Sequence, residues 1–260
     1  ARRRRIGTQS HGARGSGKTS ILKAIDSAEQ SENLSLKAQL DPVATGSVGV
    51  YMRVQDLFTQ SFAGVPWSNL GAGDERVLEY TFLASLIEAE ASYRLLKLLV
   101  AWRSSGVISY SFSEARSVAA ALARAFPQLS GVFGEGRSDP LDDAAQAFLH
   151  LRKSLARALL RGDALQLEAL LVAEPLEMVR TVALSALPFI DRHRPGRNLE
   201  PLSFKICVDE CDYLTAHQQI ALNTLVRRTS APVDFVVAYV DSSYDPTTTL
   251  FENLTLSGAD

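Results

Sequence analysis

The chain has 260 residues, and 46% of them are hydrophobic, which is enough for one large domain or for one domain with a sizeable insertion. Its formal net charge of −2 excludes a surface that binds nucleic acid over its whole extent, so any contact with DNA or RNA must come from a local patch. No apolar stretch of the sequence reaches the roughly 18 residues that a transmembrane helix needs.

A glycine-rich motif near the start of the chain predicts a phosphate-binding loop. Residues 6–11 are expected to form the first strand, and Gly12-Ala13-Arg14-Gly15-Ser16-Gly17-Lys18-Thr19 follows it in the pattern G-x-x-x-x-G-K-[ST]. In such a loop the backbone N–H groups surround the phosphates, Lys18 reaches the β- and γ-phosphates, and the Thr19 hydroxyl binds Mg²⁺. A helix over residues 20–28 adds the positive end of its dipole. The residues predicted to contact the nucleotide are Gly12, Arg14, Gly15, Ser16, Gly17, Lys18, Thr19 and Ser20.

The middle of the chain is predicted to be mostly helical. Residues 48–54 are typical of a second strand, and apolar side chains then recur at helical spacing up to residue 187. We expect helices over residues 74–104, 113–126, 141–160 and 163–172, and a proline- and arginine-rich connector over residues 188–201. Ser113 is the expected N-cap of the second of these helices. Lys18 and Asp209 lie 191 positions apart, more than a compact P-loop core needs. Residues 74–187 are therefore expected to be a helical insertion between the two parts of an ATPase core, residues 1–73 and 188–260.

A second motif, over residues 204–210, predicts the metal site and the catalytic base. It is a mostly apolar run that ends in Asp209-Glu210, as expected for a buried strand that carries a Walker B carboxylate pair. Thr19 and Asp209 are expected to hold Mg²⁺, with Asp209 acting through water. Glu210 is expected to polarise an attacking water, which favours hydrolysis over transfer to a second substrate. The alternative for Glu210 is a surface carboxylate at a strand end. Lys18 and Glu210 are thus the predicted catalytic residues.

The last elements supply two further candidates. A helix over residues 215–228 ends in Arg227 and Arg228, which either stabilise the helix C-terminus or provide an arginine finger to a neighbouring subunit. A strand over residues 232–240 is followed by Ser242. Ligands bind at the carboxyl ends of parallel strands, so Ser242 is a candidate sensor of the γ-phosphate.

On these residues the chain resembles an AAA+-type P-loop ATPase of the origin-recognition (initiator-like) group, most of all its bacterial members. The matching stretches are residues 11–19, 49–54, 204–212 and 218–225, and the strand at 233–240 stands where that group has its sensor strand. The resemblance implies an α/β fold with a P-loop NTPase parallel sheet of AAA+/STAND-like type. It also implies ATP and Mg²⁺ as cofactors, with nucleotide and hydrolysis roles for Lys18, Thr19, Asp209 and Glu210. A homo-oligomer or an effector protein is the implied partner, and some bacterial members resemble parts of anti-phage defence systems.

Other functions stay open at this point. A nucleotide-regulated scaffold would bind ATP, turn it over slowly and use γ-phosphate contacts to hold one conformation. A superfamily-2 helicase would use residues 209–212 as its D-E-C-D box, although no P-T-R-E-L-like segment lies between the motifs and no S-A-T follows the box. A small-molecule kinase is disfavoured by Glu210 beside the metal aspartate. Binding of nucleic acid by a local patch also remains open.

Two further features concern the setting of the chain. Cys207 and Cys211 are too few for a zinc site or a disulfide framework, so we expect two buried thiols and a reducing, cytoplasmic location. The sequence starts at Ala1 rather than at a methionine and stops soon after a predicted strand, so we expect it to be a piece of a longer protein.

Overall fold

A parallel β-sheet forms the centre of the computed structural model. The structure describes residues 8–11, 17–28, 46–57, 74–129, 139–194, 201–240, 245 and 247–251, and for residues 8–11 the backbone alone. The strands are β1 (Thr8–His11), β2 (Ser47–Arg53), β3 (Ser203–Asp209) and β4 (Val233–Tyr239). They pair in the order β1-β4-β3-β2, and every pair is parallel. This confirms the predicted α/β class and is compatible with a P-loop NTPase fold.

The strand order decides where the ends of the strands lie. In a parallel sheet all carboxyl ends meet at one edge, and β4 stands between β1 and β3. The carboxyl ends of β1, β4 and β3 therefore lie side by side. The phosphate-loop motif, Asp209-Glu210 and the region of Ser242 are the sequences that follow these three strands.

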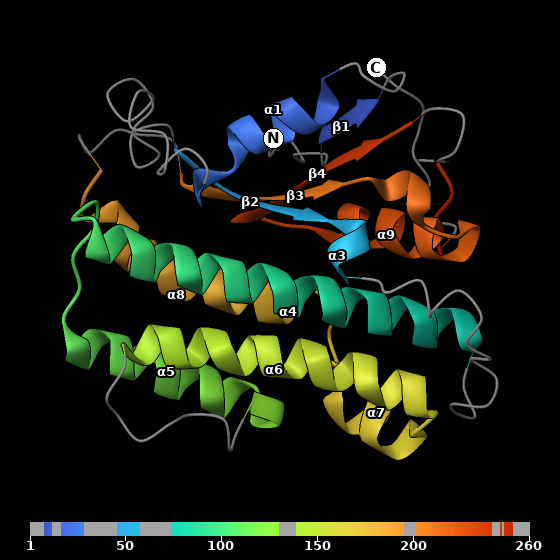
Figure 1. Ribbon diagram of the computed structural model, residues 1–260, viewed down its shortest axis with the longest axis horizontal. Helices are drawn as coiled ribbons and strands as arrows, with labels where there is room; N and C mark the ends of the chain where they lie inside the picture. Colours follow the sequence, from blue (N-terminus) through green and yellow to red (C-terminus); the bar gives the residue numbers. More distant parts are fainter. Residues whose placement is uncertain are drawn as a thin grey trace.

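One face of the sheet is covered by α1 (Lys18–Ile25), as Figure 1 shows. Leu22 of this helix packs in a small buried cluster with Tyr51, Cys207, Val236 and Ala238. Helix and sheet approach so closely that a Cβ atom on Gly49 would lie 1.9 Å from the carbonyl oxygen of Ile25. Only glycine permits this approach, which fixes the position of α1 on the sheet.

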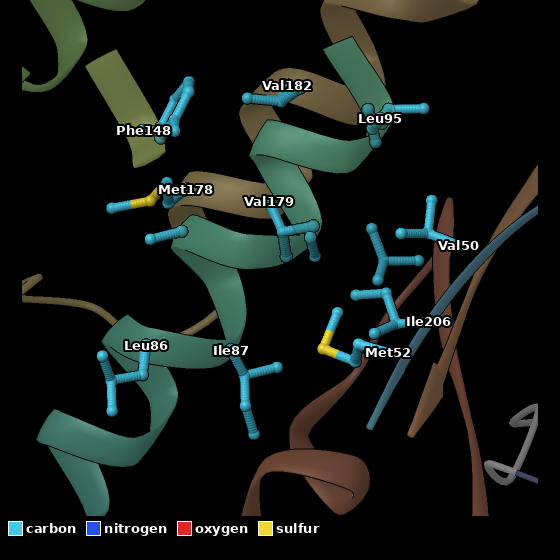
Figure 2. Close-up of a cluster of buried hydrophobic side chains, with 14 of the residues drawn as sticks. Val50, Met52, Leu86, Ile87, Leu95, Phe148, Met178, Val179, Val182 and Ile206 are labelled. Atoms are coloured by element: carbon cyan, nitrogen blue, oxygen red, sulfur yellow. The ribbon is translucent and has the colours of Figure 1, made fainter. Parts of the chain in front are cut away.

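The other face packs on α4 (Glu75–Ser104), α8 (Glu177–Asp191) and α9 (Ala216–Arg228). The sheet contributes Val50, Met52 and Ile206 to the hydrophobic cluster between the sheet and these helices. The helices contribute Ile87, Leu95 and Val179, which face the three strand residues (Figure 2). Alternate residues of each strand face opposite sides, so the same strands supply both this cluster and the one under α1. The short helix α3 (Val54–Leu57) continues from β2.

A third layer of helices lies beyond α4, on the side away from the sheet (Figure 1). It contains α5 (Phe112–Ala125), the 3-10 turn η3 (Pro127–Leu129), α6 (Pro140–Arg161) and α7 (Ala164–Leu170). Because α4 stands between this layer and the sheet, it is buried on most of its circumference, and one hydrophobic cluster runs from the sheet through α4 to Phe148 of α6. No helix in the described ranges is both long and apolar enough to cross a membrane.

Among the boundaries that differ from those expected from the sequence, two have a clear physical cause. The N-cap of α5 is Ser111 rather than Ser113, because Ser111 and Glu114 form a reciprocal capping box: the Ser111 Oγ accepts from the Glu114 N–H at 3.2 Å, and the Glu114 Oε2 accepts from the Ser111 N–H at 2.7 Å. In addition, α8 runs through Pro188 to Asp191, so the connector does not begin at Pro188. Pro188 removes one helical hydrogen bond, but the burial of Phe189 and Ile190 on the following turn offsets that loss.

Candidate nucleotide-binding site

Asp209, the last residue of β3, is buried and has both carboxylate oxygens engaged. Its Oδ1 accepts a hydrogen bond from the Glu210 N–H at 2.9 Å, and its Oδ2 accepts one from the Tyr51 hydroxyl at 3.0 Å. Burial, followed by the charge of Asp209, raises the pKa of the Tyr51 phenol, so it remains a neutral donor at physiological pH. The direction of the Asp209 carboxylate is therefore set by two fixed donors.

Glu210 adopts a backbone conformation that is rare for a residue with a side chain. Its φ is 62°, in the left-handed region, where the chain turns out of β3 into the 3-10 turn η4 (Cys211–Tyr213). Its Oε2 is buried and has no hydrogen-bond partner among the residues that the structure describes. Burial raises the pKa of this carboxyl, while the charge of Arg53 opposes the rise. A strained backbone and an unpaired buried acceptor at the same residue are typical of functional sites.

The described part of the phosphate-loop motif lies at the start of α1. Gly17 has a φ of 83° and is the N-cap of the helix, and Lys18, Thr19 and Ser20 form the first turn. The positive end of the helix dipole is at this turn, which favours an anion there. Gly12, Arg14, Gly15 and Ser16 lie outside the described residues, and so does Ser242.

A cleft of about 390 Å³ brings the two motifs together, which is within the size range of ligand pockets. The described residues that line it come from the first turn of α1, the end of β3 with the turn after it, and the end of β4. They are Gly17, Lys18, Thr19, Ser20, Asp209, Glu210, Asp212, Tyr213, Ala238, Tyr239 and Val240. The fold thus places in one cleft every described residue that was predicted to contact the nucleotide, to hold Mg²⁺ or to act as the base. Their roles in binding and catalysis remain predictions.

Arg227 and Arg228 lie elsewhere. They end α9, which returns from the carboxyl edge of the sheet towards the start of β4, and neither is among the described residues lining the cleft. An Nη1 of Arg228 is 3.5 Å from the Tyr80 hydroxyl, and its guanidinium is 6.0 Å from the centre of the Phe251 ring. A contact with nucleotide by either arginine would therefore have to be made in a neighbouring subunit.

Sequence reasoning did not identify Tyr51 as part of the site. It reaches Asp209 because the register places Tyr51 opposite Cys207 and Arg53 opposite Asp209, so that the phenol spans the sheet diagonally. The only signal in the sequence is a tyrosine within a mostly apolar strand. Arg53 itself pairs with Asp56 at 2.9 Å and 3.2 Å.

Both cysteines are buried free thiols, as expected. Burial raises the pKa of Cys207 to about 12, and that of Cys211 also rises for the same reason. Neither thiol is therefore a reactive thiolate at neutral pH. The cytoplasmic location inferred from these cysteines stays a prediction.

The fold and the cleft together define an α/β protein compatible with the P-loop NTPase class. The ORC-CDC6-like family model matches residues 11–260, so the chain belongs to the ORC-CDC6-like family. This confirms the resemblance to the origin-recognition group, and it indicates AAA+ ATPase-like function with nucleotide binding. No curated protein and no solved structure gives a significant match to the chain.

Proposed function

We propose that the chain binds ATP with Mg²⁺ in this cleft, hydrolyses it, and acts as a molecular switch inside a larger assembly. The observation that carries the proposal is the meeting of Lys18 and Thr19 with Asp209 and Glu210 in one cleft. Membership of the ORC-CDC6-like family supports the same chemistry.

The residues of the cleft fit a magnesium ion. Mg²⁺ prefers oxygen ligands and keeps several waters, and the Thr19 hydroxyl and the Asp209 carboxylate supply oxygen at this place. These two residues would hold the ion, which when bound neutralises charge on the phosphates. Lys18 would add a positive charge beside the β- and γ-phosphates from the first turn of α1.

Glu210 is the residue that favours hydrolysis in this proposal. Its Oε2 has no hydrogen-bond partner among the described residues, and Glu210 lines the cleft, which supports a role in accepting a proton from a water bound there. Asp209 is the last residue of β3, and the left-handed backbone at Glu210 turns the chain away from the strand. The Glu210 side chain still lines the cleft. A general base must lie within hydrogen-bond reach of its water, and the proposal is supported by the position of Glu210 in the lining of the cleft where that water would bind.

The wider role is supported by fewer observations. We propose that residues 74–187 are an insertion within the ATPase core, supported by their position in the chain between β2 and β3. Assembly into a homo-oligomer or with an effector is supported by the position of Arg227 and Arg228 away from their own cleft, where they suit a finger supplied in trans. A part in anti-phage defence rests on the resemblance to bacterial members alone.

Steady-state release of phosphate from ATP tests the proposal. The wild type should hydrolyse ATP only with Mg²⁺, and Glu210→Gln should bind ATP but lose at least about a hundredfold in rate. Glu168→Gln, an exposed carboxylate on α7, is the matched control and should keep the wild-type rate. Normal turnover by Glu210→Gln would remove it as the base. ATP binding without turnover in the wild type would favour the scaffold.

The same assay over a range of protein concentrations, with mass measured by light scattering, tests the assembly. A rate per chain that rises with concentration, together with an ATP-dependent oligomer, is the expected result for a finger in trans. Arg227→Ala and Arg228→Ala should then lower the rate without lowering ATP affinity. A concentration-independent rate from a monomer would contradict the assembly. Stimulation by duplex DNA would point to the initiator or helicase role instead.

A further inference from the structure

Tyr51 is fixed in place from several sides. Its backbone N–H donates to the Asp26 Oδ1 at 3.2 Å, and its carbonyl oxygen accepts from the Arg94 Nη1 at 2.8 Å. Its ring lies in the buried cluster under α1, beside Leu22 and Cys207. The phenol therefore has little freedom to turn, and its hydroxyl meets the Asp209 Oδ2 from a fixed direction.

The anchor of Tyr51 extends into the helices on the opposite face of the sheet. The Arg94 Nε also donates to the Glu90 Oε1 at 2.6 Å, and the Glu90 Oε2 accepts from the Arg152 Nη1 at 2.5 Å. The Glu90 side chain is only 2% exposed, whereas the side chains of Arg94 and Arg152 are 35% and 22% exposed. A continuous set of polar contacts thus connects Asp209 through Tyr51 and Arg94 to α4 and α6.

We propose that Tyr51 is the positioning residue for the metal carboxylate of this site: its hydroxyl orients Asp209 so that the remaining lone pairs face the cleft. This inference rests on the proposed function. The Glu210 N–H alone would leave the carboxylate able to rotate, since a single donor fixes one oxygen only. Partners that hydrogen-bond a ligating carboxylate orient it, and their loss typically weakens metal binding by about tenfold to a hundredfold.

Tyr51→Phe is the direct test, because it removes the hydroxyl and keeps the ring. Tyr110→Phe is a matched control: the Tyr110 hydroxyl donates to the Asp139 Oδ2 at 2.9 Å, and Tyr110 is as deeply buried, but this pair lies at the start of α6, far along the chain from the cleft. The affinity for the fluorescent nucleotide mant-ATP is measured in EDTA and over a series of Mg²⁺ concentrations, and the rate of ATP hydrolysis is measured alongside.

In EDTA, all three proteins should bind mant-ATP equally. The Mg²⁺ concentration that gives half of the gain in affinity should rise about tenfold in Tyr51→Phe and stay unchanged in Tyr110→Phe. In an Asp209→Asn background, Tyr51→Phe should have no additional effect, because it acts through that carboxylate. This cycle separates positioning from a general loss of stability.

The outcomes distinguish this inference from the proposed function. A wild type whose mant-ATP affinity responds to Mg²⁺, together with an identical response in Tyr51→Phe, would overturn the role of Tyr51 and leave ATP binding intact. A wild type that does not bind mant-ATP under either condition would overturn both. An equal shift in Tyr51→Phe and Tyr110→Phe would also overturn the role of Tyr51, since the effect would then be structural.

Discussion

Glu88, fully buried in the middle of α4, binds the backbone of Leu176 at the start of α8: its Oε1 accepts from the Leu176 N–H at 2.6 Å. The Oε2 accepts from the Met178 and Val179 N–H groups at 2.9 Å and 3.2 Å. A side chain 88 positions earlier in the chain therefore supplies the cap that Leu176, with a φ of 79°, does not make itself. This contact joins α4 and α8, two of the three helices that pack on the same face of the sheet.

The Glu88 cap predicts a specific dependence of stability on pH. Burial raises the pKa of Glu88 to about 7, against the lowering effect of its three backbone donors, and Glu177 contributes a further rise. The pKa of Glu88 is higher in the folded protein than its ordinary value of 4.5. Its contribution to the free energy of unfolding is therefore fully present below about pH 4.5 and is lost as the pH rises through about 7. The total change corresponds to about 3 kcal/mol.

Urea unfolding between pH 4.5 and pH 8 checks this prediction. The free energy of unfolding of Glu88→Gln should vary less over this interval than that of the wild type, since the variant does not titrate. Glu168→Gln, an exposed carboxylate on α7, should keep the wild-type profile. Parallel profiles for wild type and Glu88→Gln would show that Glu88 does not titrate in this interval.

Gly49→Ala should be among the most damaging single substitutions in the chain. The added Cβ would lie 1.9 Å from the carbonyl oxygen and 2.6 Å from the carbonyl carbon of Ile25, so α1 must move off the sheet. We expect a loss of about 3 kcal/mol or more in the free energy of unfolding. Because α1 begins with Lys18, ATP affinity should fall as well.

Gly162→Ala provides the comparison for Gly49→Ala. Gly162 has a φ of 65° and no atom within 4 Å of an added Cβ, so only the left-handed backbone opposes the substitution. The expected cost is about 1 kcal/mol by urea unfolding. Equal losses for the two alanine variants would mean that the contact between α1 and β2 is not tight.

The capping box of α5 gives a test of the helix boundary. Ser111→Ala should lower the free energy of unfolding by about 1 kcal/mol, because it removes the acceptor of the Glu114 N–H. Ser113→Ala, two positions into the helix, should change it by less than about 0.5 kcal/mol. The reverse order of the two effects would restore Ser113 as the cap.

Acidification should weaken the same helix end. Arg192, together with Ser111, lowers the pKa of Glu114 to about 2, so its contribution to stability is present above the ordinary value of 4.5 and is lost only as the pH falls towards about 2. Titration of the Glu114 carboxyl by NMR should report the low pKa in the wild type. In Arg192→Ala it should move back towards 4.5, and an unchanged value would exclude Arg192 as the cause.

The parts of the site that could be predicted are those encoded by local patterns. The motif that ends in Lys18-Thr19 and the apolar strand that ends in Asp209-Glu210 each follow from a short stretch of sequence. The parallel sheet then brings them together, because both lie at carboxyl ends of strands. The match to the family model covers residues 11–260, which include both motifs.

Tyr51 and Glu88 could not be predicted in the same way. The contact of Tyr51 with Asp209 depends on the register of β2 against β3, which is decided by packing of the whole sheet. Glu88 is a charge within a helical pattern, which usually indicates a solvated face, and only the docking of α8 on α4 gives it three backbone donors. The prediction that the connector begins at Pro188 was wrong for a related reason. Burial of the following turn of α8 outweighed the helix-breaking effect of this proline.

Titration calorimetry of ATP into the protein with Mg²⁺, for the wild type and for Lys18→Ala, tests the central claim most directly. Lys23→Ala, an exposed lysine on the same helix that is not among the described residues lining the cleft, serves as the control. Saturable binding by the wild type and Lys23→Ala, with no detectable binding by Lys18→Ala, is the predicted result. Tight binding of ATP by Lys18→Ala would contradict the assignment of this cleft as the nucleotide site.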